Sequence, residues 1–276
     1  GGLVLVNCPD CFFYTAKRKC QAAIGKAGSK LLKSYTKAVG KCRDRFNAGT
    51  PLFTDAEGTV ALDDFDDCPL EAKAAKSLAR AGLSARALVS RFCSDTEVSQ
   101  LNSCADSVDG LVTATGDGGC LIATHFDSAD DAIEQLYGPA LIGDQTALEG
   151  CQKTLGKAGA KYIGGTLKAL QKCKDSFYKG KALYKDAAKT EQIFDSNACS
   201  EEYKTARKIA KTGLKARKLV AGARCSDALT AGLGACASTV DGLVDAGGEA
   251  GCLILGHAQE AFSMLRAEYC DDAICP

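Results

Sequence analysis

Several residue types that usually build large cores or carry chemistry are scarce in this chain of 276 residues. It contains no tryptophan, one methionine and two histidines, and aromatic residues make up only 7% of it. Large flat side chains therefore cannot dominate the core, and so few histidines support little metal binding. The 34 basic side chains balance the 34 acidic ones, which gives no electrostatic case for nucleic acid or for an anionic membrane surface. No apolar run approaches the ~18 residues of a membrane-spanning helix, so we expect no membrane insertion.

Cysteine is the abundant exception, with 16 residues. In a reducing cytosol these would be free thiols or metal ligands, and the shortage of histidine disfavours the second role. We therefore expect an exported, disulfide-bonded protein in an extracellular or cell-surface location. The chain begins at Gly1 without a charged or apolar leader, and we expect that a signal peptide has been removed.

The spacing of the cysteines repeats. Six cysteines in the first half are separated by 22, 26, 25, 11 and 16 positions, and six in the second half by 22, 26, 26, 11 and 16. The two sets are Cys20, Cys42, Cys68, Cys93, Cys104 and Cys120, and Cys151, Cys173, Cys199, Cys225, Cys236 and Cys252. The offset is 131 positions and rises to 132 after one insertion. This pattern predicts two tandem copies of one unit.

The residues between the cysteines agree with this interpretation. A motif Cys-Gln-x-x-(Ile/Leu)-Gly-Lys-Ala-Gly-x-Lys, ending in Lys-Cys-x-Asp, runs from Cys20 to Asp44 and again from Cys151 to Asp175. The motif resembles secreted bacterial proteins that are built from tandem cysteine-rich helical repeats. The resemblance covers most of both units and implies the architecture. That group has no established activity, so the resemblance implies no catalytic residue and no cofactor.

Apolar residues recur every three or four positions, which indicates amphipathic helices. The first helix is predicted over roughly residues 14–47 and its copy over roughly 145–180, each with an apolar stripe, and the polar face of the first is rich in lysine. The lysines of the first are Lys26, Lys30, Lys33, Lys37 and Lys41. A second helix is predicted from Pro69, a residue suited to a first helical turn, to about Phe92. A third follows Cys104, and a last one runs from about Gly119 to Tyr137.

The predicted class is all-α, with two tandem disulfide-stapled four-helix units. We expect an extended N-terminal segment over residues 1–13, the first unit over 14–138 and the second over 139–276. Leu3–Val6 is the only segment that reads as a strand.

Antiparallel packing of the first two helices narrows the disulfide pairing within each unit. We favour Cys42–Cys68, Cys93–Cys104 and Cys20–Cys120, and in the second unit Cys173–Cys199, Cys225–Cys236 and Cys151–Cys252. The main alternative exchanges partners to give Cys20–Cys93 and Cys104–Cys120. A bridge that closes a loop of 26 residues would contribute roughly 3 kcal/mol.

Candidate sites for chemistry are weak. His125 and His257 occupy equivalent positions and are the only candidates for a metal or haem ligand, but hydrogen-bonded helix histidines explain them better. Cys8-Pro-Asp-Cys11 has the spacing of redox motifs, yet it stands at a terminus and structural disulfides are favoured.

The acidic stretch Asp63–Asp67 reads as a loop that leads into a helix N-terminus rather than as a calcium site. Gly25 and Gly28 lie inside a helix, which favours close helix packing over phosphate binding. We predict no enzyme, no metal and no cofactor.

Four cysteines fall outside the repeated set, and they lie at the chain ends: Cys8, Cys11, Cys270 and Cys275. By the repeat offset they correspond to the junction around Gly138 and Pro139. Docking of one molecule's C-terminal end on the next molecule's N-terminal end would reproduce that junction, and such a contact gives an open filament. The apolar segment Leu3, Val4, Leu5 and Val6 could insert into the neighbour. The alternative pairs these cysteines within one molecule.

The sequence therefore predicts a non-enzymatic secreted structural protein, a subunit of a disulfide-reinforced extracellular filament or surface assembly, with itself as partner. A secreted monomeric binding module for a small or apolar ligand is the alternative. A haem-binding electron-transfer protein is a third, weaker hypothesis.

Overall fold

The structure is a computed structural model that describes residues 15–101, 103–137, 141, 146–222 and 224–269. These residues form an all-helical fold, as predicted, and contain no β-sheet. Their only extended pairings are two isolated bridges, Phe53 with Ala61 and Tyr184 with Gln192.

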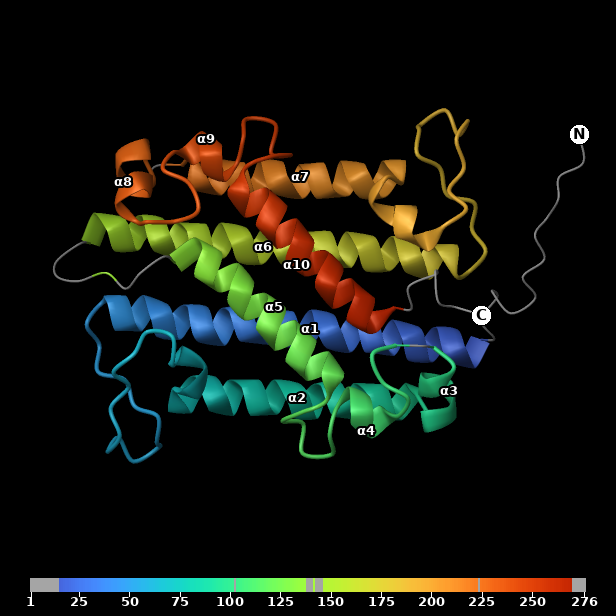
Figure 1. Cartoon of the computed structure of the whole chain (residues 1–276), viewed down its shortest axis with the longest axis horizontal. Coiled ribbons are helices and arrows are strands. Elements are labelled where there is room, and N and C mark those ends of the chain that lie inside the picture. The colour runs from blue at the N-terminus through green and yellow to red at the C-terminus, as the bar shows by residue number, and fades with distance from the viewer. Residues whose placement is uncertain (1–14, 102, 138–140, 142–145, 223, 270–276) are drawn as a thin grey trace, which may run out of the picture.

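Long helices build one layer. Their bounds are α1 Thr15–Asn47, α2 Ala72–Phe92, α6 Thr146–Phe177 and α7 Tyr203–Val220. In Figure 1 they lie side by side in the order α2, α1, α6, α7, with α1 and α6 antiparallel at the centre. The two lysine-rich helices are therefore neighbours.

Two further helices cross this layer obliquely on one face. They are α5, Cys120–Tyr137, and α10, Cys252–Glu268, and they pack on each other as well as on α1 and α6 (Figure 1). Short helical turns complete the fold: η1 Cys68–Leu70, α3 Asp95–Ser99, α4 Val108–Leu111, η2 Ser196–Ser200, α8 Asp227–Gly232 and α9 Val240–Leu243. The same order of elements thus occurs on both sides of the segment at residues 138–145.

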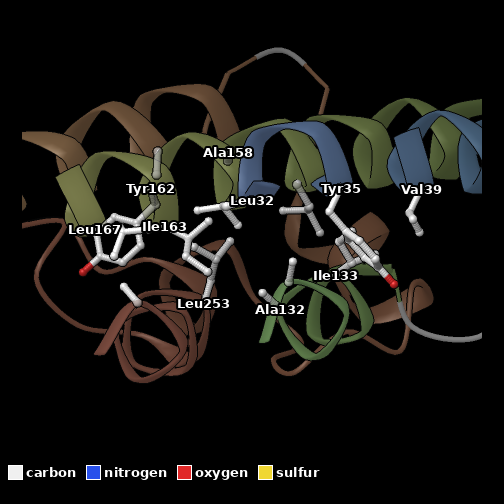
Figure 2. Packing of buried hydrophobic residues seen from close by; sticks show 14 of the residues in the cluster. Leu32, Tyr35, Val39, Ala132, Ile133, Ala158, Tyr162, Ile163, Leu167 and Leu253 are labelled. Atoms are coloured by element: carbon white, nitrogen blue, oxygen red, sulfur yellow. The ribbon is translucent and has the colours of Figure 1, made fainter. Parts of the chain in front are cut away.

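The hydrophobic core lies between the layer and the crossing helices. Figure 2 shows Leu32 of α1, Ile163 of α6, Ile133 of α5 and Leu253 of α10 among the residues that fill it. All four side chains are buried, and they belong to one cluster that draws on both halves of the chain. Burial of apolar surface therefore joins the halves as well as stabilising each.

The second long helix begins later than predicted. Pro69 lies in the turn η1, and the α-helix starts only at Ala72. The residue before it, Glu71, caps the helix, because its Oε2 accepts a hydrogen bond of 2.8 Å from the backbone N–H of Ala74. A buried carboxylate at a helix N-terminus satisfies an otherwise unpaired donor and opposes the helix dipole.

Twelve described cysteines form six disulfides. Cys42–Cys68 and Cys173–Cys199 are the pairs that the sequence analysis favoured. The remaining four favoured pairs are wrong: Cys93–Cys104, Cys20–Cys120, Cys225–Cys236 and Cys151–Cys252. The structure has instead the exchanged partners, Cys20–Cys93, Cys104–Cys120, Cys151–Cys225 and Cys236–Cys252.

The reason for the exchange lies in where α5 begins. The loop before it packs its backbone against the middle of α2, because Gly82 has no side chain to hold off the carbonyl of Gly116. Gly116 itself has a φ of 71°, a conformation that suits glycine. Cys120 therefore starts α5 beside the middle of α2, which leaves Cys93 at the end of α2 to meet Cys20, with 4.7 Å between their Cα atoms.

The residues of the predicted end-to-end contact lie outside the described part of the chain. They are Leu3, Val4, Leu5, Val6, Cys8, Cys11, Cys270 and Cys275. The filament therefore stays a prediction, as do the predicted unit boundaries.

Candidate functional site

A groove with a volume of about 990 Å³ runs between α1 and α6. Its walls carry ten exposed lysines, and we call it the α1–α6 groove. These lysines are Lys26, Lys30, Lys33, Lys37 and Lys41 of α1, and Lys153, Lys157, Lys161, Lys168 and Lys172 of α6. At 1.5 Å per residue, the wall from Ala22 to Asp44 is about 33 Å long. The groove is thus an elongated site with positive charge on both sides.

The positive charge of the groove is largely uncompensated. Among its ten lysines only Lys153 forms an ion pair with a residue that the structure describes, with 3.8 Å between its Nζ and Oδ2 of Asp44. The neighbouring helices α2 and α7 contain no acidic residue. In contrast, α5, on the other side of the layer, contains four acidic residues and no basic one. A chain without net charge thus gathers basic side chains along the α1–α6 groove, which attracts anions.

The floor of the groove is apolar at its centre. The buried side chains of Leu32 of α1, Ile163 of α6 and Ile133 of α5 lie beneath it, and the small residues Ala160 and Gly164 of α6 are partly exposed. A ligand that lies in the groove can therefore touch these small residues and the apolar stems of the lysines.

Each end of the groove holds a tyrosine–aspartate pair. At one end the hydroxyl of Tyr137 donates to Oδ1 of Asp44 over 3.0 Å. At the other end Tyr269 donates to Oδ1 of Asp175 over 2.8 Å. Burial raises the pKa of both carboxyl groups above the usual value, and the tyrosine hydrogen bonds oppose this shift. In each pair the tyrosine occupies one carboxylate oxygen. The second oxygen of Asp175 can accept a hydrogen bond from a ligand, whereas the second oxygen of Asp44 lies 3.8 Å from Nζ of Lys153.

A buried polar cluster lies beneath the Tyr269 end. Nε2 of His125 is 2.9 Å from Oε1 of Glu268, and both side chains are fully buried. Gln171 donates through Nε2 to both oxygens of Glu268, over 2.9 and 2.7 Å. Nδ1 of His125 lies 2.9 Å from the carbonyl of Leu121. Burial raises the pKa of Glu268, while the His125 contact and the Gln171 hydrogen bond oppose the rise.

The glycine motif of α1 makes room for this cluster. A Cβ on Gly28 would overlap Oε1 of Glu268 and Nε2 of His125. A Cβ on Gly25 would lie 3.1 Å from the hydroxyl of Tyr269. The two glycines therefore permit the close helix packing that the sequence predicts, and the structure places them inside α1.

His257 stands 132 positions after His125, yet its surroundings differ. Its side chain is fully buried and lines the floor of the α1–α6 groove. Neither ring nitrogen makes a well-formed hydrogen bond to a described residue. Burial lowers its pKa to about 4, and the carbonyl of Leu253 opposes the shift. The imidazole is therefore neutral at pH 7, and the carbonyl of Leu253 is a polar group that acts on it.

The other candidate residues from the sequence have structural partners. In the acidic stretch 63–67, Oδ1 of Asp66 accepts from Arg43 over 3.3 Å, and Oδ1 of Asp64 accepts from the backbone of Asp66. Within the described residues no three His, Cys, Asp or Glu side chains gather as a metal site. Cys8 and Cys11 fall outside those residues.

Sequence reasoning found the lysines of the groove but missed their use. It assigned Lys26, Lys30, Lys33, Lys37 and Lys41 to the polar face of a helix, which is correct. The repeated motif indicates that the copy of this helix has a similar stripe. The sequence does not show the antiparallel contact of α1 with α6, and this contact brings the two stripes together as the walls of one groove.

Comparison with protein-family models, with curated protein sequences and with solved structures found no match. Among the described helices, none combines the length and the apolar character that crossing a bilayer requires.

Proposed function

We propose that the protein is a secreted, non-enzymatic binding protein whose α1–α6 groove holds a linear acidic polysaccharide. The observation that carries the proposal is the row of five exposed lysines on each wall of a groove of about 990 Å³. Along each helix most of these lysines recur every three or four residues, so positive charges repeat about every 5–6 Å. A polymer with an acidic group on its repeating unit can contact several of them at once.

The carboxylates at the ends favour a sugar polymer over a polymer of phosphates. Asp44 and Asp175 repel anions but accept hydrogen bonds from hydroxyl groups. Acidic polysaccharides carry both kinds of group. The lysines are point charges on flexible stems, which suit charges at variable positions better than rigid bidentate recognition.

Other extended ligands fit less well. Single-stranded nucleic acids bind through aromatic side chains on which bases stack, and the aromatic residues that line the groove, Tyr137 and Tyr269, are at most 3% exposed. An extended peptide would need partners for its backbone, and the described residues have no sheet edge to offer.

The proposal of binding without catalysis rests on the separation of the carboxylates. Glycoside hydrolysis requires two carboxyl groups roughly 5–10 Å apart around one bond. Asp44 and Asp175 lie at opposite ends of a groove about 33 Å long. They therefore cannot act together on one glycosidic bond.

Secretion is part of the proposal. Six disulfides among the described residues fit an oxidising compartment. We also infer that the two halves are copies of one helical unit, which is supported by the equal order of their elements and by disulfides at equivalent positions. Assembly through the chain ends remains a separate prediction that the groove does not require.

The test measures binding of fluorescently labelled oligogalacturonate and heparin oligosaccharides to the full chain at low and at physiological salt. The groove variant replaces Lys33, Lys37, Lys161 and Lys168 by Gln. The matched control replaces Lys76, Lys204, Lys211 and Lys218 by Gln, which removes the same charge from exposed lysines outside the groove lining.

We expect the groove variant to lose about tenfold or more in affinity and the control to lose much less. We also expect affinity to fall with salt, because screening weakens exposed charges. Equal losses in both variants would mean that net charge, and not the groove, attracts the polymer. Absence of binding to the unaltered chain would overturn the proposal.

A further inference from the structure

A second groove, with a volume of about 920 Å³, lies between α1 and α2, and we call it the α1–α2 groove. Its basic lining residues are Lys30, Lys33, Lys37, Lys41 and Arg45 of α1, and Lys73 and Arg80 of α2. At 1.5 Å per residue, the wall from Lys30 to Arg45 is about 22 Å long. The basic surface of the molecule thus extends beyond the α1–α6 groove and onto α2.

One row of lysines separates the two grooves. Four lysines of α1 line both of them: Lys30, Lys33, Lys37 and Lys41. Steps of three and four residues keep these lysines on one face of the helix, and all four are exposed. Helix α1 therefore forms a ridge of positive charge with a groove on each side.

The positive charge of the α1–α2 groove is hardly compensated. The acidic residue in its lining is Glu71, and this carboxylate already has partners. Its Oε1 lies 3.2 Å from Nη1 of Arg45, and its Oε2 accepts from the backbone N–H of Ala74. The other basic residues of the groove form no ion pair with any residue that the structure describes. The groove consequently keeps a net positive charge that attracts anions.

Small side chains and hydroxyl groups line the rest of the α1–α2 groove. Ala74 and Ala81 of α2 are buried in its lining, while Ser34 of α1 and Ser77 and Ser84 of α2 are at least partly exposed. A serine hydroxyl both donates and accepts hydrogen bonds, as does the hydroxyl of a sugar. The groove therefore offers charged partners for acidic groups and hydroxyl partners for sugar hydroxyls.

We propose that the α1–α2 groove binds a second strand of the acidic polysaccharide, so that one protein molecule holds two polymer strands, one on each side of α1. This role as a bridge between strands rests on the proposed function of the α1–α6 groove and extends it. Packed helices have axes about 8–10 Å apart, so two strands in neighbouring grooves lie about that far from each other.

Two effects limit the repulsion between the strands. The shared lysines of α1 stand between them, and salt at physiological concentration screens exposed charges over about 8 Å. The second strand should bind more weakly than the first. Helix α6 supplies five lysines to the α1–α6 groove, whereas α2 supplies only Lys73 and Arg80 to the other.

The number of oligosaccharides bound per protein chain tests the proposal. Isothermal titration calorimetry is done on the monomer from gel filtration, with oligogalacturonate about as long as the α1–α6 groove. The unaltered chain should bind two molecules with different affinities. The variant Lys73→Gln/Arg80→Gln should bind one, and its tighter affinity should change less than about twofold. The matched control, Lys76→Gln/Arg91→Gln, alters exposed residues of α2 outside the groove lining and should still bind two.

The opposite variant removes the tighter site and leaves the weaker one. It replaces by Gln four exposed lysines of α6 that line only the α1–α6 groove: Lys157, Lys161, Lys168 and Lys172. This variant should bind one oligosaccharide with the weaker affinity. Circular dichroism checks that each variant is folded.

Light scattering of long polygalacturonate measures the bridging itself. The unaltered chain should join polymer strands and raise the scattering, because each molecule holds two strands. The Lys73→Gln/Arg80→Gln variant should coat the polymer and raise the scattering much less at equal binding.

The outcomes separate the second groove from the proposed function. Binding of one oligosaccharide to the unaltered chain, or equal effects of Lys73→Gln/Arg80→Gln and its control, would show that the α1–α2 groove holds no strand, and the function of the α1–α6 groove would stand. If the unaltered chain binds no oligosaccharide, both proposals are wrong.

Discussion

Nε2 of His125 and Oε1 of Glu268 lie 2.9 Å apart in the interior, although 143 residues separate them in the chain. His125 lies in α5, and Glu268 is the last residue of α10. The contact therefore joins the two crossing helices to each other, and through Gln171 it joins them to α6. A fully buried ionisable pair adds little over an apolar substitute, but loss of one member leaves the other without a partner.

Replacement of Glu268 by Ala should strongly destabilise the fold. His125 and Gln171 would lose their shared acceptor, and the free energy of unfolding should fall by about 3 kcal/mol. Urea unfolding followed by circular dichroism measures the loss. Glu268→Gln keeps an acceptor and should cost less than half as much. The control Glu57→Ala changes an exposed side chain and should have almost no effect. Similar losses for Glu57→Ala and Glu268→Ala would contradict the importance of the buried contact.

Gly28 and Gly150 both lie inside long helices, but only one of them touches the cluster. A methyl group on Gly28 would overlap Glu268 and His125, whereas a Cβ on Gly150 has nothing within 4 Å. Gly28→Ala should therefore destabilise the protein by about 2 kcal/mol through overpacking. Gly150→Ala should stabilise it by about 0.5–1 kcal/mol, because alanine favours a helix over the unfolded chain. Thermal unfolding of the two variants distinguishes a packing effect from helix propensity. A change in stability of the same sign in both variants would contradict the packing effect.

The disulfides should contribute unequally. Cys20–Cys93 links residues 73 positions apart, and Cys104–Cys120 links residues only 16 apart. In the chain-entropy account the first contributes about 4 kcal/mol and the second about 3 kcal/mol. The double variant Cys20→Ala/Cys93→Ala should consequently unfold at lower urea than Cys104→Ala/Cys120→Ala. Mass spectrometry of peptides from non-reduced protein checks the pairing itself, and a Cys93–Cys104 peptide would contradict the fold.

His257 should make the protein less stable in acid. Its pKa is about 4 in the folded state, whereas an unfolded histidine has a pKa of about 6.5. As the pH falls below about 6.5, the unfolded chain takes up a proton before the folded one, so stability falls until about pH 4. Once the pH is below both pKa values, the loss in the free energy of unfolding amounts to about 3 kcal/mol.

The comparison of the unaltered chain with His257→Leu isolates this contribution. Burial raises the pKa of Glu268, which acts in the opposite direction: its contribution is complete at low pH and is lost as the pH rises through its folded pKa. That contribution is present in both proteins. Unfolding free energies at pH 7 and pH 4 should differ more in the unaltered chain than in the variant. An equal difference would show that His257 is not the buried neutral group described above.

The sequence predicted structural features correctly where their physical cause lies in neighbouring residues. Steps of three and four residues placed α1 within one residue of its start, since helix periodicity depends only on neighbouring turns. It misplaced the start of α2 because Pro69 suits an α-helical first turn and a 3-10 turn equally well. It also missed α3, whose five residues are too few to show a period.

Residues far apart in the chain decided the rest. The pairing of Cys20 with Cys93 depends on where Gly116 packs on α2, and spacing alone permits both alternatives. Likewise the sequence does not indicate that Glu268 and Gln171 lie beside His125. They are 143 and 46 positions away from it along the chain, and helix periodicity relates only residues a few positions apart.

The amino-acid order by itself determined the helical class, the presence of many cysteines with repeated spacing, and the lysine stripe on the first long helix. Each of these depends on residue type and short-range spacing. Tertiary structure alone decided that the stripes on α1 and α6 face each other across one groove, and that His257 reaches its floor without the carboxylate that His125 has. The physical reason is that charge and hydrogen bonding act through space, so the meaning of a lysine or a histidine depends on which distant helix packs beside it.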